Sequence, residues 1–181
     1  MINWKKLNQD IENSKRIVLS THMSPDGDGL GSASAMHHHI SSLGLECRII
    51  QISKFPDQYN FLNKNNIIET YDATVHDQWL DNVDLALIFD VGAYHRLGPL
   101  GDVLSANQIN VINIDHHPDL GDERFGENYI NIHAAATGEM VYDFFEENNI
   151  RMNSEIASGI YTAVMTDTGS FRHSNTNQKS H

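Results

Sequence analysis

Short apolar runs alternate with polar, glycine-containing segments along the chain. Apolar residues four apart, such as Leu7 and Ile11, are typical of helices. The pattern predicts helices over 5–14, 31–43, 138–148 and 154–165. Continuous apolar runs predict buried strands over 16–20, 47–51, 85–89 and 110–114. Residues 53–82 have a mixed pattern that predicts no single element, and the tail 173–181 lacks a core-forming pattern.

The alternation of strands and helices predicts the α/β fold class. Such chains form a largely parallel, Rossmann-like sheet with helices on both faces. In sheets of this kind, ligands bind beyond the carboxyl ends of the strands. Functional residues are therefore expected directly after the predicted strands.

Composition narrows the class of protein further. The 181 residues suit one domain with a sizeable core. Apolar runs are far shorter than the ~20 residues that span a membrane, and the N-terminus lacks the apolar core of a signal peptide. With one cysteine, Cys47, no intrachain disulfide can form. We therefore expect a cytoplasmic protein without a membrane partner.

The net charge of −12, from 12 Lys+Arg against 24 Asp+Glu, excludes a basic nucleic-acid footprint. An acidic protein that acts on phosphates needs something to bridge the like charges, and divalent cations do so. The 11 histidines leave room for a metal site.

Three predicted strands run into residues that can bind metals. The first precedes His22, Asp26 and Asp28, within the polar segment 21–32; the second ends at Asp90; the third ends at the run Asp115, His116 and His117. A fourth carboxylate, Asp167, ends a predicted helix, and spacing alone does not place it. Oxygen and imidazole ligands without thiolate favour Mn²⁺ or Mg²⁺ over structural zinc.

Structural interpretations compete with this one. An aspartate at a strand end is often a cap or turn residue, whereas four such segments together favour a shared site. The glycines at 27, 29 and 31 are expected to let the loop turn tightly; their G-x-G-x-G spacing does not match a dinucleotide-binding loop. His37, His38 and His39 point ~100° apart on a helix, and Cys47 lies in an apolar strand. We expect structural roles for these four.

Together the segments resemble the DHH phosphoesterase family, named for Asp-His-His. The resemblance covers about residues 14–176 and rests on four motifs in the family's order: His22-x-x-x-Asp26-x-Asp28 with Gly31-Ser32, then Asp90, then Asp115-His116-His117, then Thr166-Asp167-Thr168-Gly169. Asp-His-His alone is weak evidence, whereas four ordered motifs are strong. The closing segments 166–172 and 174–176 resemble the branch of bifunctional oligoribonucleases that also remove the 3'-phosphate of phosphoadenosine phosphate.

The resemblance implies two divalent ions, Mn²⁺ preferred and Mg²⁺ the alternative. One ion is expected on His22, Asp26 and Asp90. The other is expected on the ligand set Asp28, Asp90, His116 and Asp167. Asp90 would bridge the two ions. The resemblance counts Asp90, Asp115, His116 and His117 as catalytic, with Asp115 orienting a histidine and His117 contacting the substrate phosphate. Arg96 and Arg172 are candidates for a phosphate contact or for a surface role.

The implied activity is two-metal hydrolysis of short single-stranded oligoribonucleotides to 5'-mononucleotides, of the 3'-phosphate of phosphoadenosine phosphate, or of both. Alternatives are a cyclic dinucleotide phosphodiesterase, an inorganic pyrophosphatase and a metal- or nucleotide-binding module without turnover. The sequence leaves open whether the protein is a monomer or a homodimer.

Two departures from the family pattern stand out. Ser24 occupies a position where the family usually has Asn. The family normally continues into a second, substrate-binding domain with a Gly-Gly-Gly-His motif, which this sequence does not contain. We therefore expect residues 1–176 to form the catalytic domain and 177–181 to begin a linker to a missing domain, the chain being a fragment.

Overall fold

A six-stranded, all-parallel sheet forms the centre of the computed structural model, which describes residues 2–118 and 120–181. Its strand order is β3-β2-β1-β4-β5-β6. The strands are β1 (Arg16–Thr21), β2 (Glu46–Gln51), β3 (Ile68–Thr70), β4 (Leu85–Phe89), β5 (Asn110–Asp115) and β6 (Glu127–Ile130). The chain builds outward from β1 to β3 and then returns to add β4 on the other side of β1. The order therefore reverses between β1 and β4, where open α/β sheets bind ligands.

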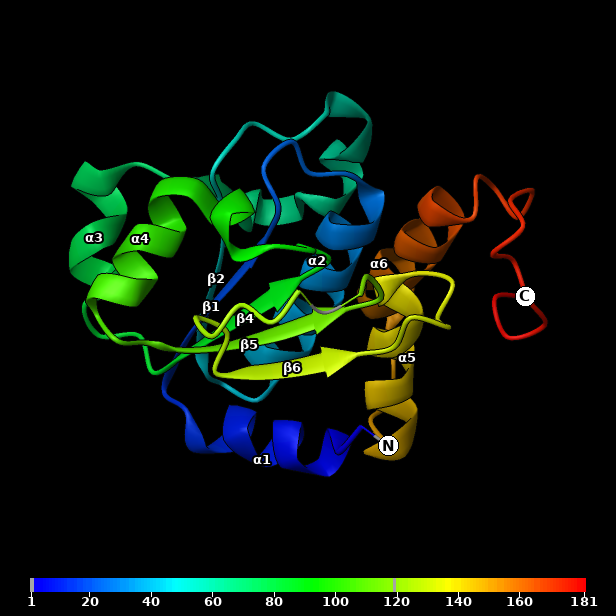
Figure 1. Cartoon of the computed structure of the whole chain (residues 1–181), viewed down its shortest axis with the longest axis horizontal. Helices are drawn as coiled ribbons and strands as arrows, with labels where there is room; N and C mark the ends of the chain where they lie inside the picture. Colours follow the sequence, from blue (N-terminus) through cyan, green and yellow to red (C-terminus); the bar gives the residue numbers. More distant parts are fainter. Residues whose placement is uncertain (1, 119) are drawn as a thin grey trace.

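Helices cover both faces of the sheet, as Figure 1 shows. The α-helices are α1 (Trp4–Asn13), α2 (Gly27–Ser42), α3 (Ala73–Leu80), α4 (Gly98–Ala106), α5 (Thr137–Glu147) and α6 (Ser154–Asp167). The larger core packs α1, α2, α5 and α6 on one face, with strand residues such as Ile17 and Leu19. The smaller core packs α3 and α4 on the other face. Val18, which lies between Ile17 and Leu19 in the sequence, belongs to this smaller core. This alternation confirms the predicted fold class.

The predicted helices and strands all form, with ends shifted by a few residues. Helix α1, for example, begins after Asn3, whose side chain accepts a hydrogen bond from the Lys6 amide, and it buries Leu7 and Ile11. Within the described residues, no helix combines the length and the apolar character needed to cross a bilayer.

The start of α2 corrects one prediction. The helix begins at Gly27 rather than at residue 31, because the Asp26 side chain accepts hydrogen bonds from the amides of Asp28 and Gly29 (3.0 and 3.3 Å). The glycines at 27, 29 and 31 are helical and do not form a tight turn. They instead allow close packing, since a Cβ at Gly31 would collide with the Gly159 carbonyl of α6. The tight-turn prediction is therefore wrong.

Several short elements escaped prediction. The unassigned range 53–82 holds β3, α3 and two 3₁₀ helices, η1 (Asp57–Leu62) and η2 (Lys64–Asn66). The 3₁₀ helix η3 (Tyr94–Leu97), α4 and the edge strand β6 were also missed. An edge strand as short and polar as β6 has no apolar run to reveal it.

The histidine run and the cysteine lie away from the strand-end aspartates. His39 is buried, and its ring contacts Phe144 and Phe145 edge-on. His37 contacts His38, and burial lowers the pKa of His37 to about 4. Cys47 packs against the larger core, and burial raises the pKa of its thiol. Its thiolate form is therefore disfavoured.

Candidate metal centre

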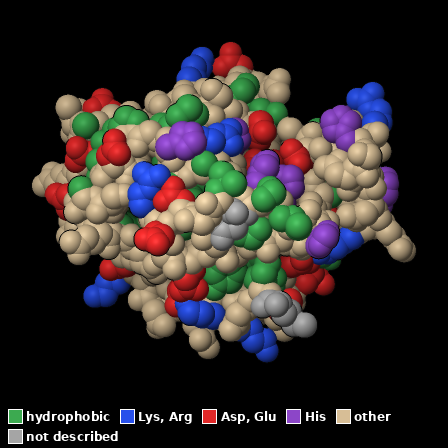
Figure 2. Space-filling model, viewed as in Figure 1, with side chains coloured by type: hydrophobic (Ala, Val, Ile, Leu, Met, Phe, Trp, Pro, Cys, Tyr) green, Lys and Arg blue, Asp and Glu red, His purple; other side chains and the backbone are tan. Residues whose placement is uncertain are grey.

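The carboxyl ends of β1, β4 and β5 bring metal-binding side chains together from distant parts of the chain. Three groups, with ligand atoms all within 4.8 Å of one another inside each group, lie at this edge: His22, Asp26 and Asp90; Asp28, His116 and Asp167; Asp90, His116 and His117. Helix α2 starts beside this edge and α6 ends there, so Asp28 lies with the strand-end residues, and so does Asp167, which spacing alone did not place. Figure 2 shows histidine and acidic side chains gathered between the sheet edge and α6.

Asp90 lies between the first two groups. Its Oδ2 is 3.7 Å from His22 Nε2, and its Oδ1 is 3.5 Å from His116 Nε2. The residue is 3 % exposed and has a left-handed backbone (φ 57°), a conformation that aspartate tolerates better than most residues. One carboxylate oxygen thus faces each side of the centre.

The first side of the centre contains His22 and Asp26. His22 Nδ1 lies 2.7 Å from the Met23 carbonyl, which can only accept, so Nδ1 carries a proton and Nε2 faces the carboxylates. That Nε2 is 3.8 Å from Asp26 Oδ2. Burial acts to lower the pKa of His22, but the carboxylates of Asp26 and Asp90 outweigh it and raise the pKa to about 9.

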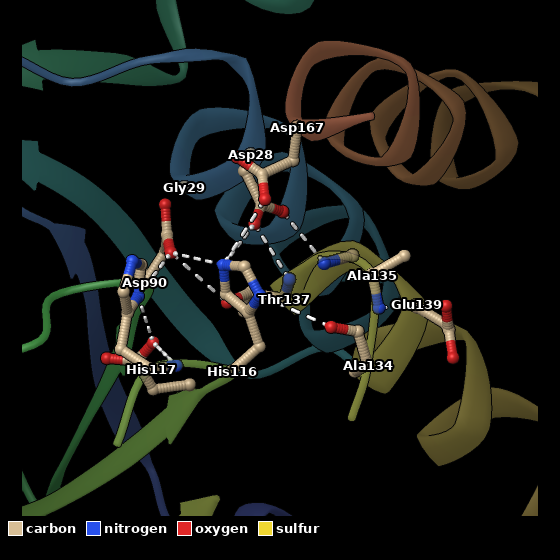
Figure 3. Close-up of polar contacts among 12 residues, drawn as sticks. Asp28, Gly29, Asp90, His116, His117, Ala134, Ala135, Thr137, Glu139 and Asp167 are labelled. Carbon is tan, nitrogen blue, oxygen red and sulfur yellow. Dashed lines mark hydrogen bonds and ion pairs between the residues drawn. The ribbon is translucent and has the colours of Figure 1, made fainter. Parts of the chain in front are cut away.

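The second side contains Asp28, His116 and Asp167. Nε2 of His116 is 3.7 Å from Asp28 Oδ2 and 3.4 Å from Asp167 Oδ2, with the ring arranged as in Figure 3. These separations are longer than hydrogen bonds, and this buried nitrogen has no hydrogen-bond partner among the described residues. The imidazole nitrogen and the carboxylate oxygens face one another without direct hydrogen bonds. A cation placed between them would be coordinated by all of these atoms.

Electrostatics within the cluster also fit a cation. Burial and the charges of Asp90 and Asp167 raise the pKa of Asp28 well above its usual value. Burial likewise raises the pKa of Asp167. Burial opposes ionisation of Asp90 too, but the neighbouring imidazoles outweigh it and lower its pKa. Divalent ions would offset this repulsion between buried carboxylates, so the residues present fit the metal group implied by the sequence.

Asp115 and His117 stand at the edge of the cluster. The Asp115 carboxylate is 1 % exposed; its Oδ1 accepts from the His117 amide (2.9 Å) and lies 2.8 Å from His117 Nδ1, and its Oδ2 accepts from the Gly92 amide (2.6 Å). Asp115 therefore orients the His117 ring and the loop after Asp90. The His117 side chain is 47 % exposed, and hydrogen bonds to Asp115 and Asp90 raise its pKa to about 10.

The start of α5 holds the Asp28 carboxylate, a contact that the sequence did not reveal. Its Oδ2 accepts from the Thr137 amide (2.7 Å) and its Oδ1 from the Gly138 amide (2.8 Å), both at the start of α5. The positive end of the helix dipole thus points at a buried carboxylate. Nothing in the spacing of Asp28 and Thr137 along the chain indicates this contact.

Arg96 is a second contributor whose position the sequence did not reveal. Its Nη1 donates to the Val91 carbonyl (3.0 Å), directly after Asp90, and its carbonyl accepts from the Met23 amide (2.9 Å), directly after His22. Arg96 therefore ties together the loops that carry His22 and Asp90. Arg172 is exposed and donates from Nε to the Gly169 carbonyl (3.0 Å).

This fold and cluster define a class of α/β domains in which carboxylates and imidazoles converge at the switch point of a parallel sheet. The sequence profile described as "DHH family, N-terminal domain" matches residues 16–165, and the chain belongs to this family. The resemblance inferred from the four motifs is thereby confirmed.

Relatives show the same affiliation. The chain is 30% identical over 179 residues to the bifunctional oligoribonuclease and PAP phosphatase NrnA of Thermus thermophilus, covering 96% of this chain and 51% of that protein. It is 26% identical to the probable NrnA of Streptococcus mutans, covering 99% of this chain and 54% of that one. The chain thus spans about half the length of these curated relatives.

Solved structures agree on the fold. An exopolyphosphatase-related protein from Bacteroides fragilis superposes with a TM-score of 0.90 at 26% identity, covering 97% of this chain and 53% of that one. Exonuclease RecJ bound to manganese superposes with a TM-score of 0.53 at 15% identity, covering 95% of this chain and 44% of that one.

Proposed function

We propose that this chain is the catalytic domain of a two-metal phosphoesterase that hydrolyses short oligoribonucleotides to 5'-mononucleotides, the 3'-phosphate of phosphoadenosine phosphate, or both. The observation that carries the proposal is the position of Asp90, with one carboxylate oxygen facing each ligand group. Two relatives that cover nearly the whole chain bear the NrnA name, which supports this substrate class.

In this proposal the two halves of the cluster hold one ion each. The first ion would be held by His22, Asp26 and Asp90. The second would be held by Asp28, Asp90, His116 and Asp167. Two divalent ions of this kind supply an activated water and neutralise charge on the phosphoryl oxygens. Mn²⁺ is the preferred candidate, in keeping with the ligand types and with a relative named probable manganese-dependent inorganic pyrophosphatase.

The protein's own groups then fix the geometry. The amides of Thr137 and Gly138 hold the Asp28 carboxylate in place. Asp115 holds Nδ1 of His117, which leaves Nε2 of this half-exposed ring free to donate to a phosphoryl oxygen. His117 thus contacts substrate, whereas Asp115 is a positioning residue.

To test the proposal, the protein is depleted of metal and its hydrolytic activity is then assayed on three substrates with and without added metal. The substrates are the dinucleotide pApA, phosphoadenosine phosphate and pyrophosphate. We expect release of 5'-AMP from pApA, release of phosphate from phosphoadenosine phosphate, or both. Mn²⁺ should restore this activity more than Mg²⁺ does, and EDTA should abolish it. Faster turnover of pyrophosphate would replace the proposal with the pyrophosphatase alternative. Metal-dependent nucleotide binding without any product would favour the binding module.

Metal affinity is expected to rise with pH up to about 9. Below that pH a proton occupies His22 Nε2, because the pKa of His22 is raised to about 9, and an ion can bind only the neutral ring. At pH 7.5 Mn²⁺ binding should therefore release about one proton or more. Calorimetric titration in two buffers of different ionisation enthalpy measures this number. Equal Mn²⁺ affinity at pH 6.5 and pH 8.5 would contradict the assignment of His22, while the exposed-site variant His133→Gln should leave the proton count unchanged.

Replacing Arg96 by Ala is expected to weaken Mn²⁺ binding roughly 10- to 100-fold, as loss of a supporting contact around metal ligands typically does. The reason is the loss of the guanidinium hydrogen bond to Val91, next to Asp90. Calorimetry of Arg96→Ala and Arg96→Lys measures the effect, with the exposed Arg151→Ala as control. A variant with unchanged Mn²⁺ affinity but a raised KM would instead assign Arg96 to substrate.

A further inference from the structure

A groove of about 350 Å³ lies beside the metal centre, between the 3₁₀ helix η1 and the end of α6. Among its lining residues are Gln58, Tyr59, Phe61, Thr166, Gly169 and Arg172. The volume is within the range of small-molecule sites. The proposed hydrolysis accounts for the centre but not for this groove.

The groove adjoins the ligand residues directly. Thr166 and Gly169 line it, and Asp167 lies between them in sequence. On the other side, Gly27 lies between Asp26 and Asp28, and a Cβ added there would collide with Thr166 and lie 2.9 Å from Tyr59 Cε1. The inner end of the groove is therefore one residue away from both carboxylate-bearing segments of the centre.

The side chains of the groove suit a flat aromatic ligand. Phe61 lines the groove and is 52% exposed, so its ring is accessible to a ligand there. Arg172, across the groove on the turn after α6, is anchored by its Nε to the Gly169 carbonyl (3.0 Å). Its terminal nitrogens can donate to acceptor atoms of a ring, and the Gln58 amide can both donate and accept. An exposed aromatic face with adjacent polar donors is how proteins hold nucleobases with little sequence preference.

We propose that this groove binds the nucleobase adjacent to the scissile phosphate, stacked on Phe61 and hydrogen-bonded by Arg172. The inference rests on the proposed function, because that function delivers a nucleotide to the centre. The groove would then favour substrates that carry a base. A phosphate ester without a base reaches the same centre but receives no additional binding affinity from the groove. Pyrophosphate, which has no ring, would likewise leave the groove empty.

The test uses Phe61→Ala and Arg172→Ala in the full chain. The matched control is Tyr161→Ala, a similarly exposed aromatic residue (59%, against 52% for Phe61) on α6 that lines a different pocket. Each protein is assayed with pApA and with an abasic dinucleotide that keeps the phosphodiester but lacks the bases. We expect Phe61→Ala to raise the KM for pApA by on the order of tenfold or more with little change in kcat, and to leave the KM for the abasic compound unchanged. Equal KM values for pApA in the wild type and in Phe61→Ala would overturn the inference.

A binding measurement separates this inference from the proposed function. AMP is titrated into the wild type and the variants in the presence of Mn²⁺, without any turnover. Weaker AMP binding by Phe61→Ala and Arg172→Ala, but not by Tyr161→Ala, supports the groove even if no substrate is hydrolysed. Absence of turnover in the wild type would then count against the hydrolase proposal alone. Unchanged AMP binding in Phe61→Ala counts against the groove whether or not the wild type turns over pApA.

Discussion

Asp90→Asn is expected to reduce kcat/KM for phosphoester hydrolysis on the order of a thousandfold or more, because both ions lose a shared anionic ligand. An amide keeps the size of the side chain and tolerates the left-handed backbone of this position (φ 57°), so the fold should survive. It offers one neutral oxygen in place of two charged ones. Metal analysis of the purified variant should therefore show fewer Mn²⁺ ions per chain than the wild type, alongside the loss of turnover.

The control for this prediction is Asp102→Asn, the same chemical change at an exposed position of α4. It should leave both metal content and turnover at wild-type values. Thermal unfolding without metal shows whether Asp90→Asn has kept its fold. A correctly folded Asp90→Asn protein with normal metal content and normal turnover would show that Asp90 is not a bridge.

Gly31→Leu is expected to destabilise the fold by about 3 kcal/mol or more, the upper range for overpacking a core. Gly31 in α2 and Gly159 in α6 face each other, and a Cβ at either position would meet the backbone of the other helix. A leucine side chain must push the two helices apart. Since α2 carries Asp28 and α6 ends at Asp167, the same displacement separates two proposed ligands of one ion.

Urea denaturation of the metal-free protein measures the free energy of unfolding directly. The control is Ser41→Leu, which places the same side chain at an exposed position near the end of the same helix. Its free energy of unfolding should stay within about 0.5 kcal/mol of the wild type. Gly31→Ala should fall between the wild type and Gly31→Leu. A Gly31→Leu protein with a wild-type unfolding midpoint would mean that the helix crossing is looser than the structure indicates.

The sequence predicted the central strands well because β1, β4 and β5 are buried along almost their whole length. Apolar runs such as 85–89 stand out against polar surroundings and fix β4 to the residue. A proposed metal ligand directly follows each of the three site strands (His22, Asp90 and His116), and parallel strands end at one edge. Elements without such contrast were missed: β6 is a polar edge strand, and α3 and α4 are short.

The sequence by itself thus determined the fold class, the family and the identity of the residues at the strand ends. Only the tertiary structure decided how they meet, because contacts between residues far apart in the chain leave no trace in local periodicity. It placed Asp167 opposite His116 through the close crossing of α2 and α6 at Gly31 and Gly159. It likewise set the start of α5 against Asp28, where two amides offset part of the rise in pKa that burial and the neighbouring carboxylates cause.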